Sequence, residues 1–340
     1  MALNRLVRGF VALVCSAVAS GIAAQGVVNV YSARHYPSDD ALYERFTEQT
    51  GIEVRLLEAK SDELLTRIRN EGDASPADVF IAVDAARLQR AEDQGVFQSV
   101  SSSEIDADVP ESLRHPDGLW FGLTTRARVI FASRDRVGDD VTLDYEDLAT
   151  PAWDGRVLIR SSTNVYNQSL VASMIETVGA EQAEAWCRGI VANMSRRPQG
   201  GDTDQIRALA AGEGDVAVAN HYYYMRMLVG SEADQAAAAK VRVIFPNQDN
   251  RGTHVNICGA GVVANAPNRE NAVRFIEFLL SDEAQRAFAA GNREYPVAND
   301  VEPSQALQDL GEFKADAVNV SALGRNNTEA VKMMDRAGWR

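Results

Sequence analysis

The stretch ADVFIAV at residues 77–83 is the part of the sequence that decides the fold. Apart from Asp78 it is a continuous apolar run, which is typical of a strand buried on both faces of a parallel sheet. Residues 84–93 then return as an amphipathic helix. Short β-type runs alternate with helical segments along the rest of the chain, and this alternation predicts an α/β protein with largely parallel sheets.

The same pattern extends in both directions from this unit. Further strands are expected at 27–32, 52–57, 119–133, 156–159, 215–219, 241–245 and 254–263. Further helices are expected at 40–49, 61–71, 166–178, 181–194, 203–211, 269–280, 283–290 and 328–337. About 315 residues beyond the leader are more than one core usually holds, so two lobes are expected. We place lobe 1 at 27–125 plus 251–300, and lobe 2 at 126–250 plus 301–340.

The first residues predict export. Arg5 and Arg8 precede an apolar run at 9–20, and small residues follow, which is the order found in a secretory signal peptide. The run is shorter than the ~20 residues that a membrane span needs. A lipid anchor on Cys15 is the alternative, but a lipoprotein signal needs a small residue before the cysteine and Val14 stands there. We therefore expect residues 1–24 to be a signal peptide and the protein to be periplasmic.

Charge limits the partners. The chain carries a net charge of −14, and removing Arg5 and Arg8 with the leader makes it −14 − 2 = −16. Such an acidic chain is not expected to bind nucleic acid or anionic lipid, and we expect a monomer. The two cysteines beyond the leader, Cys187 and Cys258, can pair in an oxidising compartment or remain as buried thiols, and the sequence leaves both open.

Tyrosines gather where strands are followed by helices. Six of the nine lie in three short segments, at 31–36, 164–168 and 220–226. Ligands of α/β sheets bind at the carboxyl ends of strands, so the three segments are candidates for one site. A single tyrosine is usually a half-buried packing residue. Three adjacent rings at 222–224 cannot all point inward, however, so a polar role is expected for at least one hydroxyl.

Several phenols together suggest a hard metal ion. A phenol has a pKa near ~10 and binds metal well only as the phenolate. A trivalent cation can drive that deprotonation, and anionic oxygen ligands favour a hard ion such as Fe³⁺ over softer metals. Tyrosinate is an established ligand of ferric haem iron. The imidazole of His35 could join the oxygen ligands.

At these residues the chain resembles the periplasmic ferric-ion-binding proteins of ABC importers, a bacterial transferrin-like family. The resemblance covers essentially the whole chain after the leader. The matching segments are VYSARHY at 30–36, GLTTRAR at 122–128, NVYNQS at 164–169, PQGGDTDQ at 198–205, NHYY at 220–223 and GTHVN at 252–256. The resemblance implies a two-lobed periplasmic-binding-protein fold of type II, with the ligand cleft between the lobes.

The resemblance also implies a ligand set and a transport role. The implied iron ligands are Tyr36, Tyr166, Tyr222 and Tyr223. His35 is a ligand in some members of the family and swings away in others. Arg126 matches an arginine that faces the site, where it holds carbonate or another small anion or balances tyrosinate charge. The implied partner is an ABC permease at the inner membrane, which receives the iron.

Two other functions remain alternatives. Aromatic rings and Arg126 could hold an organic or phosphorylated anion for an ABC importer. A secreted enzyme using tyrosines as acids is the second alternative, but no zinc motif or nucleophile–base set is apparent, and we expect no catalysis. The segment 200–203, GGDT, resembles an anion-binding loop, although a helix cap by Asp202 or Thr203 is the simpler interpretation.

Overall fold

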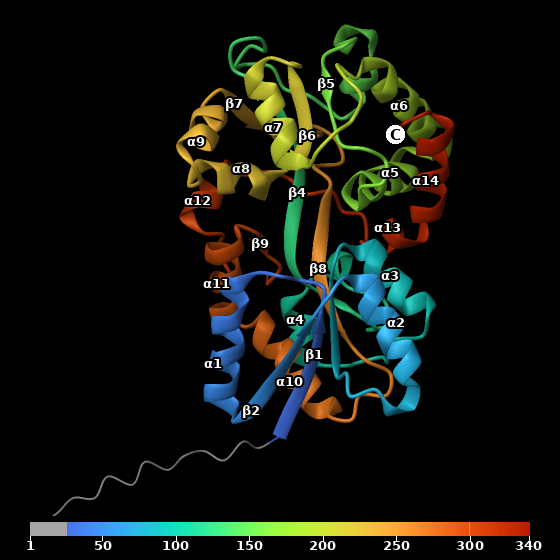
Figure 1. Ribbon diagram of the computed structural model, residues 1–340, viewed down its shortest axis with the longest axis vertical. Coiled ribbons are helices and arrows are strands. Elements are labelled where there is room, and N and C mark those ends of the chain that lie inside the picture. Colours follow the sequence, from blue (N-terminus) through green and yellow to red (C-terminus); the bar gives the residue numbers. More distant parts are fainter. Residues whose placement is uncertain (1–25, 299) are drawn as a thin grey trace, which may run out of the picture.

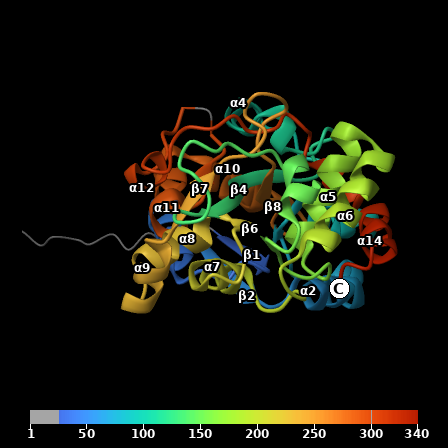
Figure 2. The ribbon, with the colours of Figure 1, turned by 90° about the horizontal axis from the view of Figure 1, so that it is seen from above.

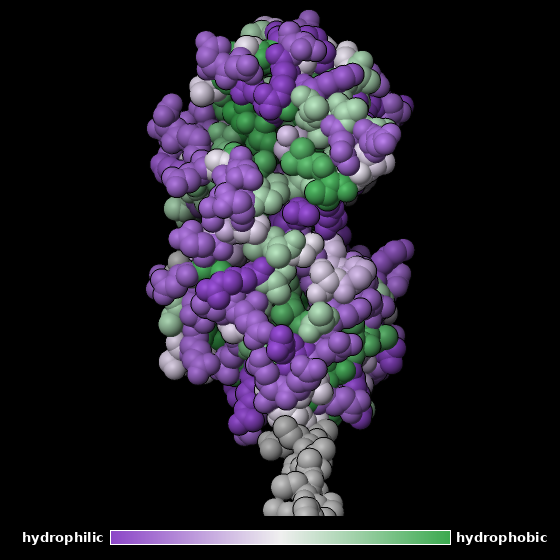
Figure 3. Space-filling view, turned by 90° about the vertical axis from the view of Figure 1, so that its left-hand side faces the viewer, coloured by the Kyte–Doolittle hydropathy of each residue, from purple (hydrophilic) through white to green (hydrophobic). Residues whose placement is uncertain are grey.

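The chain folds into two lobes, one above the other in Figure 1, joined by long central strands. This computed structural model describes residues 26–298 and 300–340, so the expected signal peptide and Cys15 lie outside the described residues. Strands β4 (Phe121–Ser133) and β8 (Val255–Val262) run along the axis of the molecule from one lobe into the other. The outline narrows between the two lobes in the space-filling view (Figure 3).

The lower lobe is built on a sheet with the strand order β2, β1, β3, β8, β4. Strand β1 (Gly26–Ser32) pairs in parallel with β2 (Ile52–Glu58) and β3 (Val79–Val83), and β8 pairs antiparallel with β3. The helices of this lobe are α1 (Asp40–Thr50), α2 (Ser61–Glu71), α3 (Ala85–Asp93), α4 (Ser103–Asp108), α10 (Arg269–Leu280) and α11 (Asp282–Asn292). Figure 1 places α1, α10 and α11 on one side of the sheet and α2 and α3 on the other.

The upper lobe is built around the second half of β4. This half pairs antiparallel with β6 (Val216–Asn220) and β7 (Val241–Ile244), and β5 (Val157–Leu158) pairs in parallel with β6. The helices of this lobe are α5 (Val165–Val178), α6 (Ala180–Asn193), α7 (Asp202–Ala211), α8 (His221–Leu228), α9 (Glu232–Ala238) and α14 (Asn327–Arg336). Seen from above, α5 and α6 lie on one side of the lobe and α8 and α9 on the other (Figure 2).

Short elements complete the chain. The 3₁₀ helices are η1 (Pro37–Asp39), η2 (Gly72–Ala74), η3 (Glu111–Leu113), η4 (Glu146–Ala149) and η5 (Pro151–Trp153). The remaining elements are β9 (Tyr295–Pro296), which pairs with β4, α12 (Gln305–Gln308) and α13 (Ser321–Arg325). In the described part of the chain no helix combines the length and apolar character that a membrane crossing requires.

Strand β4 changes partners at the junction of the lobes. Its residues up to Ala127 pair with β8, and from Arg128 onward they pair with β6. Every residue of the strand is buried. Arg126 and Arg128 therefore lie on either side of the changeover, where a buried arginine needs a polar partner because an uncompensated buried charge is costly.

The prediction of largely parallel sheets was wrong, because the sheet is mixed. Both central strands pass through the two lobes, and their pairings with each other, with β3 and with β6 are antiparallel. Periodicity in sequence reports whether a strand is buried, and it does not report the direction of its neighbour. The exact boundary between the lobes stays a prediction.

The structure also tests the expectations about the two cysteines and about the cap of α7. Cys187 and Cys258 are both free and buried, one in the core that contains Trp186 and the other in the core that contains Phe275. The cap of α7 is made by Asp204, whose carboxylate accepts from the Gly201 amide at 2.7 Å, and not by Asp202 or Thr203.

Candidate functional site

The four tyrosines implied as ligands lie at the starts of helices, either in the first turn or directly before it. Tyr36 lies between β1 and the 3₁₀ helix that begins at Pro37. Tyr166 is in the first turn of α5, where the Asn164 side chain accepts from the Asn167 amide and caps the helix. Tyr222 and Tyr223 are in the first turn of α8, which follows β6 without a loop.

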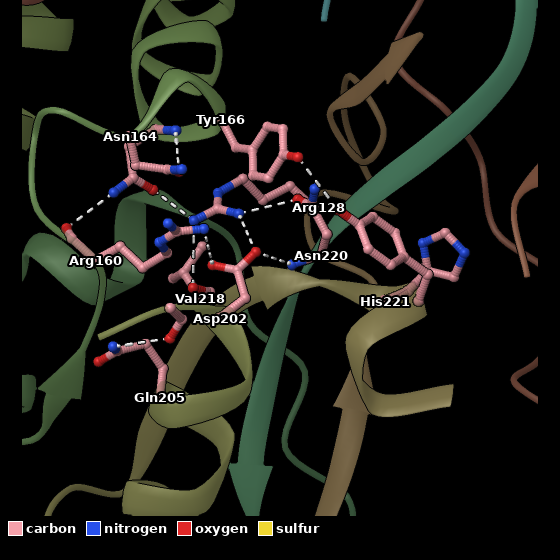
Figure 4. A network of polar contacts seen from close by, with 12 residues as sticks. Arg128, Arg160, Asn164, Tyr166, Asp202, Gln205, Val218, Asn220 and His221 are labelled. Atoms are coloured by element: carbon pink, nitrogen blue, oxygen red, sulfur yellow. Dashed lines mark hydrogen bonds and ion pairs between the residues drawn. The ribbon is translucent and has the colours of Figure 1, made fainter. Parts of the chain in front are cut away.

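The upper-lobe phenols converge. The Tyr222 hydroxyl donates to the Tyr166 hydroxyl at 3.3 Å, a contact drawn in Figure 4. The ring centres of Tyr222 and Tyr223 lie 4.3 Å apart. Two oxygens that occupy neighbouring corners of an octahedral hard cation, each about 2 Å from it, lie roughly 3 Å from each other. The spacing of the first two phenols therefore suits a shared metal ion.

Tyr36 reaches the same place from the lower lobe. The guanidinium carbon of Arg226, on α8, lies 5.1 Å from the ring centre of Tyr36 and 5.0 Å from that of Tyr222. The guanidinium of Arg34 lies 4.5 Å from the Tyr36 ring on its own lobe. Guanidinium groups over ring faces are favourable contacts, so these contacts hold a lower-lobe ring beside an upper-lobe ring.

Burial keeps these phenols protonated. The pKa values of Tyr36, Tyr166 and Tyr222 are all raised, in each case chiefly because burial disfavours the phenolate. For Tyr222 the next causes are the phenolate charges of Tyr166, Tyr223 and Tyr36, which places all four phenols within electrostatic reach of one another. Phenols whose pKa is raised by burial, as those of Tyr36, Tyr166 and Tyr222 are, become good ligands once a cation supplies the opposing charge.

Arg126 supplies positive charge at the edge of the cluster. Burial lowers its pKa, but Glu294 and the phenol groups of Tyr166 and Tyr222 outweigh burial and the pKa is raised. Its Nε lies 3.4 Å from a Glu294 carboxylate oxygen. Within the described residues its Nε and Nη2 atoms have no hydrogen-bond partner, although they are fully buried. An orphaned guanidinium edge of this kind can hold a small anion or face ligand charge.

Sequence reasoning missed the buried carboxylate of Glu294. It accepts from Arg34 Nη1 at 2.7 Å and from the Thr124 hydroxyl at 2.9 Å, and it is fully buried. Arg34 also donates to Asp39 at 2.6 Å, and it is buried. Glu294 and Arg34 are 260 residues apart in the sequence, so the sequence around Glu294 does not indicate this contact.

The histidines near the site differ from the tyrosines. His35 is 49% exposed, and its Nδ1 lies 3.5 Å from a carboxylate oxygen of Glu58, a neighbour that the sequence did not suggest. His221 is buried between the backbone of Ala127 and the carbonyl of Arg293, and burial lowers its pKa to about 4. His221 is therefore neutral at physiological pH, with both ring nitrogens engaged by backbone.

The remaining tyrosine of the triplet, Tyr224, packs into the core with its ring centre 5.5 Å from that of Phe131. Within residues 26–298 and 300–340 there is no group of three histidine, cysteine, aspartate or glutamate side chains able to hold a metal ion. The phenol cluster is thus the arrangement in the described chain whose chemistry suits a metal, and specifically a hard one.

The chain is similar to known proteins over most of its length. Residues 74–314 match the model of the bacterial extracellular solute-binding protein family. The chain belongs to this family. Among curated relatives, "Iron uptake protein A1" of Synechocystis is 52% identical over 93% of this chain and 88% of its own length.

Solved structures of solute-binding proteins agree. One from Trichodesmium, described as IdiA or FutA in complex with iron and citrate ligands, is 52% identical and covers 93% of this chain and all of its own, with a TM-score of 0.90. A ferric binding protein from Campylobacter jejuni is 41% identical over 92% of this chain and all of its own, with a TM-score of 0.85. The predicted two-lobed, type II periplasmic-binding fold is confirmed.

Proposed function

We propose that this solute-binding protein captures ferric iron between its lobes and delivers it to an ABC importer at the inner membrane. The observation that carries the proposal is the convergence of Tyr36 from one lobe with Tyr166 and Tyr222 from the other. The names of relatives about half identical to this chain, and the iron in one solved neighbour, support it. The family and the expected leader support a periplasmic location.

The proposed ligands are the four phenolates of Tyr36, Tyr166, Tyr222 and Tyr223. Together with Fe³⁺ they carry one net negative charge, which the buried guanidinium of Arg126 offsets. The unpartnered edge of Arg126 can also hold carbonate or another small anion as a further ligand. We propose that His35 remains beside Glu58 and outside the ligand set.

Capture couples proton release to lobe closure. Iron first meets the upper-lobe phenols, which are already close together, and Tyr36 completes the set as the lobes approach. Each phenol gives up a proton when it binds, because only the phenolate is a good ligand. Closure then removes the metal from water. The electrostatic interaction between the metal and the phenolates is stronger in the water-excluded site than in bulk water. Release to the permease requires the lobes to separate again.

We propose transport without catalysis, because the relatives and solved neighbours that the chain resembles are named for iron uptake or ferric binding.

Ferric citrate titration of the metal-free protein tests the proposal. We expect a saturable visible charge-transfer band at one iron per chain, which Tyr222→Phe abolishes or strongly weakens. Tyr224→Phe is the matched control, because it removes a neighbouring hydroxyl from a ring that packs in the core. A colourless wild type whose stability does not respond to iron would overturn the proposal and point to an organic or phosphorylated anion.

A further inference from the structure

Arg128 occupies the centre of a buried polar network beneath the phenol cluster (Figure 4). It lies on β4 opposite Asn220 of β6, and its side chain is 1% exposed. Its Nη1 donates to Asn220 Oδ1 at 2.9 Å and to Asp202 Oδ2 at 3.3 Å. Its Nη2 donates to Asn167 Oδ1, and to the Val218 carbonyl at 3.4 Å.

The two asparagines stand beside the proposed ligands. Asn167 directly follows Tyr166, and its side-chain nitrogen Nδ2 donates to the Arg160 and Ser161 carbonyls at 2.9 and 3.2 Å. The Asn167 side chain therefore connects the first turn of α5 with the loop between β5 and α5 and with Arg128. An arginine that holds Asn167 fixes the turn from which the Tyr166 phenol projects.

The guanidinium of Arg128 also contacts the residue at the start of α8. Asn220 is the residue before α8, a position where asparagine commonly caps its own helix. Here it makes no side-chain cap, and its oxygen is turned to Arg128 instead. The backbone amide of Asn220 donates to Asp202 at 3.2 Å, so the same ion pair also fixes the chain that leads into Tyr222.

We infer that Arg128 is a positioning residue that sets the distance between the Tyr166 and Tyr222 phenols. The inference rests on the proposed function and adds a role for a residue that does not touch the metal. A planar guanidinium presents its two amino groups in a fixed geometry, so it can hold α5 and α8 in one frame. The 3.3 Å contact between the phenol oxygens is the outcome of that frame.

A purely structural role for Arg128 makes a different prediction. A buried ion pair with Asp202 would stabilise the upper lobe, and its loss would lower stability without a specific effect on the metal. Positioning residues behind metal ligands instead change metal affinity, typically by about 10- to 100-fold. Iron affinity and the absorption band, compared at equal loss of stability, separate the two roles.

The test uses Arg128→Lys in the full-length mature protein. Lysine keeps the charge opposite Asp202, but a compact ammonium cannot hold both asparagines in place as the planar fork does. Asn193→Ala is the control, because Asn193 is buried in the same lobe and its amide donates to the Leu148 and Thr150 carbonyls at 2.8 and 2.6 Å, away from α8. Asn167→Ala is the second variant, since it removes one acceptor of Arg128 and leaves no charge unpaired.

Ferric citrate titration followed by visible absorption gives the outcome, with thermal unfolding of the metal-free proteins beside it. We expect Arg128→Lys to bind iron about 10- to 100-fold more weakly, with a displaced or weakened band, while Asn193→Ala keeps the wild-type band and affinity. Wild-type affinity and band in Arg128→Lys would overturn the inference, and Asn167→Ala decides by the same criteria if the lysine variant does not fold. A wild type without any band would overturn the proposed function itself, which is a separate result.

Discussion

Replacing Glu294 by glutamine should change stability and iron retention in opposite directions. The carboxylate is fully buried between two arginines, with Arg34 Nη1 at 2.7 Å and Arg126 Nε at 3.4 Å. Its pKa is lowered, because the two guanidiniums and the Thr124 hydroxyl outweigh the effect of burial. Glutamine keeps the shape of the side chain and removes the negative charge.

The stability loss follows from the charges that remain. Asp39 still accepts from Arg34 at 2.6 Å, so the charge left without compensation is that of Arg126. Removing one partner of a buried ion pair costs about 3–5 kcal/mol. Because the folded-state pKa of Glu294 is lowered, its contribution is present above the unfolded pKa and is lost as pH falls through the folded one. The difference between wild type and variant should therefore shrink in acid.

The effect on iron has the opposite sign. Burial is the main reason for the raised pKa of Tyr36, and the charge of Glu294 is the next. Without that charge the Tyr36 phenolate forms more easily, so the pH at which half of the iron is released should move lower.

Urea unfolding of the metal-free protein measures the first effect, and loss of the visible band on acidification measures the second. Asp282→Asn is the control, since its pair with Arg286 is exposed and is worth less than about 1 kcal/mol. Wild-type stability in Glu294→Gln, or iron release at a higher pH than wild type, would show that Glu294 neither compensates Arg126 nor opposes ionisation of Tyr36.

Three further results are expected. His35→Gln should leave iron affinity within a few-fold of wild type, because the imidazole is half exposed and lies against Glu58; a loss above about 100-fold in the same titration would show that His35 is a ligand. Iron affinity should fall with falling pH by about tenfold per pH unit for each phenol proton released, and an affinity independent of pH between 5 and 8 would contradict phenolate ligands. Cys187 and Cys258 should both react with a thiol reagent after unfolding without reductant, because both are free, and the finding of no free thiol would be contrary to the structure.

Local sequence patterns located most elements and the tyrosines. The apolar run at 77–83 predicted β3, and the periodic segment at 166–178 predicted α5, with the ends of each element within one or two residues. The positions of Tyr36, Tyr166 and Tyr222 between strands and helices could also be predicted from the local sequence. The spacing of apolar residues changes from period 2 to period 3.6 where a strand ends and a helix begins. Their role as ligands remains a prediction.

Long-range pairing could not be predicted in the same way. The antiparallel course of β4 and β8 depends on which strands meet after the chain has crossed between lobes twice. A helix was expected after the strand at 215–219, but the bounds of α8 were not predicted, because its eight residues, HYYYMRML, divide into four with low helix preference followed by four with high preference. Glu294 was missed because its partners come from β4 and from the segment after β1, far away in sequence.

The most direct test is a crystal structure of the iron-loaded protein with anomalous diffraction measured on both sides of the iron absorption edge. We predict one strong anomalous peak per chain, within bonding distance of the phenol oxygens of Tyr36, Tyr166, Tyr222 and Tyr223, with the Arg126 guanidinium beside it. An iron peak at carboxylates elsewhere on the surface, or no peak in protein saturated with ferric citrate, would show that the tyrosine cluster is not the iron site.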